Sequence, residues 1–299
     1  MLQTIQGNEA LKQSLQAALR AGRLSHSVLL CGEQGCGAGY AARCLAADYL
    51  YPQGGAQAQA VMEHRAAECI EVRGEGASGE IKIDRVRQVR RQIFETALSA
   101  NGRVVIFYGV QKMNQSSANA LLKVLEEPPQ GVLFILTATG AAAVLPTIRS
   151  RCSIHAVAPV SQADCTVWLQ QHCPTCETPE MLARIYKGYI GRAAAAAMQP
   201  DARKSFETAC ELAKAIAKQD AYTVLQVLAA YEKDKPAAAQ LLLDLSSIAA
   251  AALEGDNLFG LTPLQAARTA NQCGETLQNM SRNINQKLLL TVLGAHLVG

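Results

Sequence analysis

The chain has 299 residues, which is long enough for two or three domains with hydrophobic cores of their own. With 18% charged and 49% apolar residues we expect it to be globular, and its net charge of +3 is too small to indicate nucleic-acid binding by itself. No stretch has the order of a signal peptide or the length of a membrane span, so we expect a cytoplasmic protein without a membrane partner.

The first elements expected are a helix over 8–21 and a short strand over 27–31. Gly22 ends the helix, and the strand is an apolar run that precedes a glycine-rich segment. One face of the helix carries the apolar residues Ala10, Leu11, Leu15, Ala18 and Leu19.

The glycine-rich segment lies between a strand and a helix, which is the context of a phosphate-binding loop. Gly32, Gly35 and Gly37 are in register with that motif. Ala38 stands where the motif has the lysine that pairs with phosphates, and Gly39 stands where it has the Ser or Thr that ligates magnesium. Two interpretations remain: a backbone anion nest that binds phosphate weakly, or a turn kept only for tight strand–helix packing.

Residues 51–67 have little apolar periodicity and are expected to form a loop with a partial helix. A strand over 69–72 and a helix over 81–97 follow. The inward face of this helix is Val86, Val89, Ile93 and Ala97, and its outer face is Arg87, Arg90 and Arg91. These arginines indicate either a contact to phosphate or to another subunit, or simply a solvated basic face.

The next buried strand, 103–107, is followed by Tyr108 and Gly109. In an ATPase with a phosphate-binding loop this strand ends in acidic residues, of which the first holds magnesium and the second activates water. Neither Tyr108 nor Gly109 supplies such a group. Because two motifs that act on one metal ion have both lost their side chains, we predict no ATP hydrolysis and no tightly bound ATP.

A helix, a proline turn, a buried strand and a basic segment make up residues 116–152. The helix has an apolar face and cannot continue beyond Pro128 and Pro129. The strand over 132–136 is apolar throughout, as expected in a parallel sheet covered on both sides, and a last strand is expected over 153–157. Strands that alternate with helices over this length predict an α/β domain with a parallel sheet. The apolar face of the helix is Ala118, Leu121, Leu122 and Leu125.

The remaining residues are expected to be helical. Three short amphipathic segments over 161–199 centre on Trp168, Leu182 and Ala194. Longer helices are expected over 203–218, 220–232, 236–254, 263–280 and 284–297. The last of these carries an apolar stripe of Leu288, Leu289, Val292, Leu293 and Leu297.

Ten cysteines are scattered along the chain, and we interpret them as reduced thiols that pack as small apolar groups. Cys173 and Cys176 have the spacing of a redox motif or a zinc half-site. They lack a strand–helix context, and only Cys165 and His172 are close in sequence, so we interpret this pair as structural.

The sequence ANALLKVLEEPP over 118–129 and the triplet SRC over 150–152 resemble the AAA+ subunits of bacterial DNA polymerase clamp loaders. The resemblance implies an α/β AAA+ core over 1–158, a helical lid over 159–199 and an all-α collar domain for oligomerisation over 200–299. The two degenerate motifs resemble those of the delta-prime class of subunit, which often does not hydrolyse ATP. Relatives often carry a four-cysteine zinc module near 51–70, but this chain has no cysteine there before Cys69, so we expect no zinc and no other metal.

The resemblance implies a stator in the DNA polymerase III clamp loader, which loads a sliding clamp on primed DNA. The motor ATPase and delta-type subunits are then its partners, and the clamp and primer–template DNA are indirect ones. Arg151 of the SRC triplet would act in trans as an arginine finger on the nucleotide of the next subunit. Thr137, Thr139 and Arg192 fall at sensor-like positions, although Arg192 is equally open to a structural role.

Two functions of other classes stay open. The first is an active ATPase, either a motor subunit or a remodelling AAA+ protein; Ala38, Gly39, Tyr108 and Gly109 argue against it. The second is a nucleic-acid-binding adaptor that acts alone. The small net charge and the lack of an aromatic and basic platform argue against this adaptor.

Overall fold

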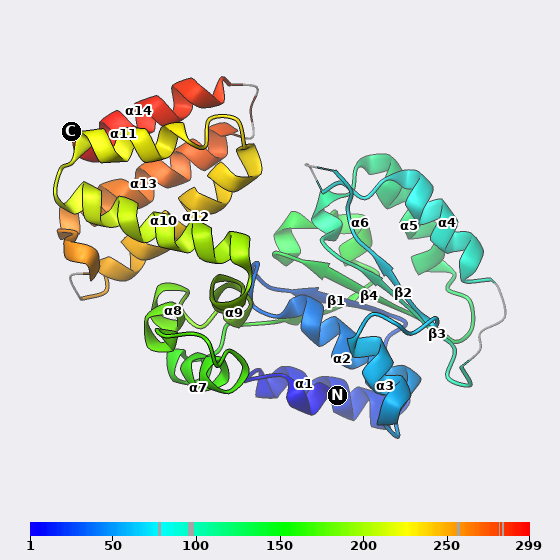
Figure 1. The fold of residues 1–299 in the computed structure, drawn as a ribbon. Coiled ribbons are helices and arrows are strands. Elements are labelled where there is room, and N and C mark those ends of the chain that lie inside the picture. The colour runs from blue at the N-terminus through cyan, green and yellow to red at the C-terminus, as the bar shows by residue number, and fades with distance from the viewer. Residues whose placement is uncertain (77–78, 95–98, 256–257, 281, 283) are drawn as a thin grey trace. The chain divides into compact units, whose positions relative to one another are not determined.

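The computed structural model describes residues 1–76, 79–94, 99–255, 258–280, 282 and 284–299 (Figure 1). The chain divides into two compact units, Met1–Val160 and Ser161–Gly299. No helix among the described residues is long and apolar enough to cross a membrane.

The first unit is an α/β domain built on a five-stranded parallel sheet (Figure 1). Its strands are β1 (Ser27–Cys31), β2 (Cys69–Val72), β3 (Arg103–Phe107), β4 (Val132–Ala138) and β5 (Ser153–Ala156). Its α-helices are α1 (Glu9–Arg20), α2 (Ala38–Leu50), α3 (Gly55–Met62), α4 (Ile83–Gln92), α5 (Gln115–Glu126) and α6 (Pro146–Arg149). The strand order is β2-β3-β4-β1-β5.

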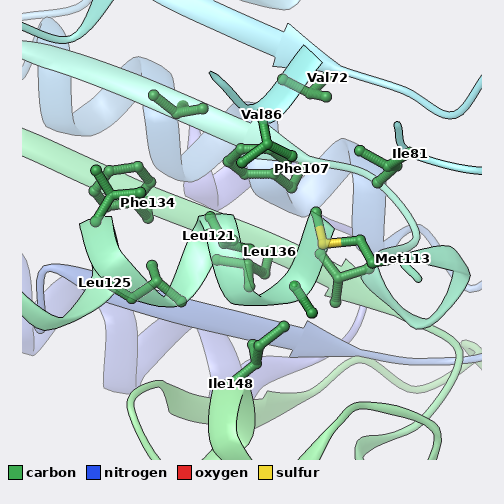
Figure 2. Packing of buried hydrophobic residues seen from close by; sticks show 14 of the residues in the cluster. Val72, Ile81, Val86, Phe107, Met113, Leu121, Leu125, Phe134, Leu136 and Ile148 are labelled. Carbon is green, nitrogen blue, oxygen red and sulfur yellow. The ribbon is translucent and has the colours of Figure 1, made fainter. Parts of the chain in front are cut away.

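Alternate residues of each central strand point to opposite faces of the sheet, and each face has its own apolar core. On one face Leu29, Phe107 and Phe134 pack with residues of α4, α5 and α6 (Figure 2). On the other face Leu30 and Ile106 pack with residues of α1, α2 and α3. Burial on both faces explains why β1, β3 and β4 consist mostly of apolar residues.

The parallel arrangement brings the carboxyl ends of β1, β3 and β4 to the same edge of the sheet. Register pairs Cys31 with Ala138, and Phe107 with Leu136. The glycine-rich loop after β1, residues 108–109 after β3 and residues 137–139 at the end of β4 therefore meet at this edge. In open α/β sheets this is where ligands bind.

The second unit is all-α among its described residues. It contains α7 (Gln162–His172), α8 (Pro179–Ile185), α9 (Ile190–Met198), α10 (Pro200–Ala217), α11 (Ala221–Ala229), α12 (Lys235–Ala252), α13 (Pro263–Met280) and α14 (Gln286–Val298). A buried carboxylate, Asp244 of α12, accepts hydrogen bonds from Tyr186, which follows α8, and from Ser205 of α10 at 2.9 and 2.7 Å. Contacts of this kind tie the segment over 161–199 to the later helices. The division into a lid and a collar stays a prediction.

Several expected boundaries and faces differ from the structure. Helix α4 begins at Ile83 because Ile81 forms a bridge to Met113, and the expected helix end at Ala97 lies outside the described residues. Ala10 is exposed, because α1 buries Leu11, Lys12 and Leu15 instead. In α14 the buried residues are Leu290, Leu293, Gly294 and Leu297, whereas Leu288 and Val292 of the expected stripe are 59% and 43% exposed.

Candidate functional site

The glycine-rich loop joins β1 to α2 and is shaped by its glycines. Gly35 and Gly37 have φ angles of 94° and 96°, a region that favours glycine, and Gly37 precedes the first residue of α2. A Cβ at Gly32 would collide with the carbonyl oxygen of Val157 and with the sulfur of Cys36. Gly32 is therefore required by the close approach of the segment after β5, which favours the packing interpretation of this turn.

Tyr108 lies over the position where a phosphate-binding loop has its magnesium ligand. A Cβ placed on Gly39 would be only 3.2 Å from Cε1 of Tyr108. A Ser or Thr at position 39 would therefore meet the tyrosine ring. The Tyr108 side chain after β3 therefore fills the space that a side chain at position 39 of α2 would occupy.

Two arginines hold this ring. Arg43, one turn after Gly39 on α2, donates a 3.5 Å hydrogen bond to the Tyr108 hydroxyl. The guanidinium of Arg73, which follows β2, lies 3.9 Å from the centre of the ring. Glu71 of β2 pairs with Arg73 at 3.3 Å. Burial, and to a lesser degree the charge of Glu71, raises the pKa of Tyr108, so the phenol stays neutral and can accept the bond from Arg43.

Gly109 and Thr137 meet at the same edge of the sheet, as expected for neighbouring strand ends. The N–H of Gly109 donates to Oγ1 of Thr137 at 3.1 Å, and Thr137 is buried. Gly109 has a φ angle of 72°, which favours glycine there. Thr139 lies beyond the strand and is exposed. Thr137 thus contacts the residues that follow β3, and the sensor role of both threonines stays a prediction.

Arg151 lies after the short helix α6 and is partly exposed. Its Nη2 pairs with Oε1 of Glu126 at 2.6 Å. Its Nη1 donates to the carbonyl oxygen of Thr147 at 3.0 Å and to Oγ of Ser150 at 3.3 Å. The guanidinium is therefore held at the surface by groups from α5 and α6. Its action on a nucleotide of another subunit stays a prediction.

Arg192 belongs to α9 in the second unit and is engaged within that unit. It donates to Oγ of Ser247 at 2.7 Å, and its guanidinium lies 4.8 Å from the ring centre of Tyr186. It is also 4.0 Å from the buried carboxylate of Asp244. These contacts give Arg192 a structural role, while its sensor role stays a prediction.

The cysteine pair expected to be structural lies after α7. Cys173 is buried and accepts, through its carbonyl oxygen, a 2.9 Å bond from the N–H of Cys176. His172 stacks on Trp168 with ring centres 4.4 Å apart. All ten cysteines are free thiols. Within the described residues, no three His, Cys, Asp or Glu side chains are grouped so that they could hold a metal ion.

Sequence reasoning did not find Arg43, Arg73 or Glu126. Arg43 follows Gly39 by four residues on a helix and Arg73 directly follows a strand, so both positions are compatible with the site edge. No sequence signal says that they meet at Tyr108, because that contact depends on the strand order. At this site the Tyr108 phenol is neutral, with one guanidinium at its hydroxyl and another over its ring.

Residues 7–161, just over half of the chain, match the family described as DNA polymerase III, delta subunit. The chain is 34% identical over 152 residues to DNA polymerase III subunit gamma/tau of Mycobacterium tuberculosis (strain H37Rv), covering 48% of this chain and 26% of that protein. It is 34% identical over 148 residues to subunit delta' of Escherichia coli K12, covering 49% and 44%. The chain therefore spans less than half the length of these curated relatives.

One solved structure shares the fold over nearly the whole chain. It is a DNA polymerase III gamma subunit-related protein from Thermotoga maritima, with a TM-score of 0.61 at 18% identity, covering 95% of this chain and 98% of that one. The predicted fold, an α/β domain with a parallel sheet followed by helices, is thereby confirmed. On the match over residues 7–161, this chain belongs to the DNA polymerase III, delta subunit family.

Proposed function

We propose that this protein is a stator subunit of the DNA polymerase III clamp loader. It does not hydrolyse ATP itself, and it supports a complex that loads a sliding clamp on primed DNA in the cytoplasm. Its family and its similarity to proteins named gamma/tau and delta' support this role. Its direct partners in this proposal are the motor ATPase and delta-type subunits, and the clamp and primer–template DNA are indirect ones.

The observation that carries the proposal is the packing of Tyr108 on Gly39. A Cβ at position 39 would meet the ring at 3.2 Å, Arg43 contacts the Tyr108 hydroxyl, and the Arg73 guanidinium lies over the ring. Magnesium ligands are absent from both motif positions, where a nucleotide-hydrolysing subunit needs them. The same geometry argues against the rival function of an active ATPase.

Arg151 gives the protein a part in catalysis by a neighbour. The glycine-rich loop of this chain lacks the lysine and the hydroxyl that hold a triphosphate. The Arg151 guanidinium therefore acts on a nucleotide that the next subunit binds. Arginines supplied in trans are worth about 10³–10⁵ in rate in other phosphoryl-transfer systems. A planar fork of donors suits the oxygens of a γ-phosphate, which lysine does not match.

The C-terminal helices carry the contacts with other subunits. Tyr222 and Leu225 of α11 are 76% and 39% exposed, and Leu288 and Val292 of α14 are 59% and 43% exposed. Helices α11 and α14 pack closely, since a Cβ on Gly294 would contact Leu225. Exposed apolar residues on two packed helices are suited to burial against the helices of another subunit.

Calorimetric titration of the isolated protein with Mg-ATP tests the nucleotide part of the proposal. We expect no site with a micromolar or lower Kd, because the loop supplies backbone donors but no magnesium ligand. A motor subunit with both motifs intact is the positive control. Tight binding that requires magnesium would contradict the proposal and favour an active ATPase.

A further inference from the structure

The guanidinium of Arg151 has a defined resting position. Three acceptors surround it: Glu126 Oε1 at 2.6 Å, the Thr147 carbonyl oxygen at 3.0 Å and Ser150 Oγ at 3.3 Å. Thr147 and Ser150 lie within four residues of Arg151, so they move with it. Glu126 is the last residue of α5 and is distant in sequence, so it alone ties the guanidinium to a different element.

Both ends of this ion pair rest on the apolar core. Leu125, next to Glu126, is buried under the sheet together with Leu121, and Ile148 of α6 is buried in the same cluster (Figure 2). Helix α5 ends at Glu126 because Pro128 and Pro129 follow. The carboxylate thus projects from a fixed helix end, whereas a surface ion pair between two mobile side chains is seldom well ordered.

The pair leaves part of the arginine available. A guanidinium has five N–H donors; both on Nη1 form hydrogen bonds, to Thr147 and Ser150, and Nη2 forms the ion pair with Glu126. The N–H on Nε forms no hydrogen bond or ion pair with the described residues, so it remains for a further acceptor. The side chain of Arg151 is 36% exposed, so another molecule can reach this donor.

We infer that Glu126 is a positioning residue that holds the Arg151 guanidinium in the orientation in which it meets the γ-phosphate of a nucleotide bound by the adjacent subunit. This inference rests on the proposed role of Arg151 in trans. Glu126 does not touch the nucleotide and acts through Arg151. Restricting a long side chain before the reaction lowers the entropic cost of reaching the transition state.

The chain offers a matched control for this carboxylate. Glu127 is the next residue, it is exposed, and its side chain forms no ion pair or hydrogen bond with the residues that the structure describes. Removal of either carboxylate changes the net charge of the same helix end by the same amount. Only removal of Glu126 breaks the ion pair that ties the Arg151 guanidinium to α5.

The test uses a reconstituted clamp loader in which the subunit beside this chain is the only one able to hydrolyse ATP. We expect Glu126→Ala to lower kcat about 10-fold and to leave KM for ATP unchanged, because positioning acts in the transition state. Glu126→Gln should recover most of the rate, since its amide oxygen still accepts a hydrogen bond. Glu127→Ala should behave as the wild type, and thermal unfolding should confirm that all variants are folded.

A double-mutant cycle with Arg151→Ala separates the possible outcomes. If Glu126 acts through Arg151, Glu126→Ala has no further effect in the Arg151→Ala background. A normal rate for Glu126→Ala beside a reduced rate for Arg151→Ala overturns the inference and leaves the proposed function intact. A rate unaffected by Arg151→Ala overturns the trans role of Arg151 itself. An equal loss from Glu126→Ala in both backgrounds contradicts positioning through Arg151.

Discussion

The contact between Gly39 and Tyr108 predicts an unusual response to Gly39→Ala. Gly39 is in the first turn of α2, and replacing a helical glycine with alanine normally stabilises a helix by up to about 1 kcal/mol. Here the new Cβ would lie 3.2 Å from Cε1 of Tyr108, inside ordinary contact distances of 3.4–4 Å. Overpacking of this kind costs roughly 1–3 kcal/mol when the neighbour cannot move.

Arg43 and Arg73 restrain the ring, so we expect the cost to exceed the gain. Gly39→Ala should destabilise the first unit by about 1 kcal/mol, which is a fall in Tm of about 2–4 °C for a domain of this size. Gly274 in α13 is the matched control, because a Cβ there meets no atom within 4 Å. Gly274→Ala should raise stability by up to about 1 kcal/mol.

Differential scanning calorimetry measures the change in stability that each glycine substitution causes. Both substitutions are measured in the wild-type background and in a Tyr108→Ala background. With the ring removed, Gly39→Ala should become neutral or stabilising, whereas Gly274→Ala should not depend on Tyr108. The expected coupling between positions 39 and 108 is about 1–2 kcal/mol. If Gly39→Ala stabilises as much as Gly274→Ala in both backgrounds, Tyr108 does not fill the space over Gly39.

Three further predictions concern the rest of the chain. Asp244→Ala should destabilise the second unit by about 2–4 kcal/mol in chemical denaturation, because two buried hydroxyls lose their acceptor; a loss below about 0.5 kcal/mol would contradict the network. Burial lowers the pKa of His155 from 6.5, so the stability that a neutral His155 contributes is present above pH 6.5 and is lost as the pH falls through the lowered pKa. The variant His155→Gln should therefore lose less stability than the wild type over that pH range. Parallel curves of stability against pH for the two proteins would refute this prediction. The double variant Leu288→Gln/Val292→Gln should associate more weakly with partner subunits in gel filtration, while its Tm stays unchanged. The control Leu264→Gln, at a 73% exposed site on α13, should associate as the wild type does.

Sequence patterns predicted those parts of the fold that local chemistry dictates. The apolar run over 132–136 lies in β4, because a strand that is buried on both faces needs apolar side chains on both. Helix α5 ends at Glu126 because Pro128 and Pro129 cannot continue it. The free cysteines, the helical second unit and the sheet between two helical layers follow from the same kind of reasoning.

Contacts between distant segments were beyond sequence reasoning. The sequence showed that the motif side chains are absent at Gly39 and Tyr108. It did not show that Tyr108 packs on Gly39, because this contact depends on β3 and β1 both lying beside β4. The pairing of Arg151 with Glu126 depends likewise on how α5 and α6 share a core. In α14 nearly every position is apolar, so periodicity did not identify Leu290 as buried and Leu288 as exposed.

The most direct test is hydrolysis by a reconstituted loader in which the adjacent subunit carries the one functional nucleotide site. With this protein as wild type, DNA-stimulated hydrolysis should proceed, while the isolated protein should hydrolyse no ATP. With Arg151→Ala or Arg151→Lys the complex should still assemble, but hydrolysis should fall about 10³-fold or more, because lysine does not reproduce the planar fork. Hydrolysis at the wild-type rate in the Arg151→Ala complex would contradict the proposal that Arg151 acts on the nucleotide of the adjacent subunit. Hydrolysis by the isolated protein would contradict the proposal that this subunit is a stator without ATPase activity.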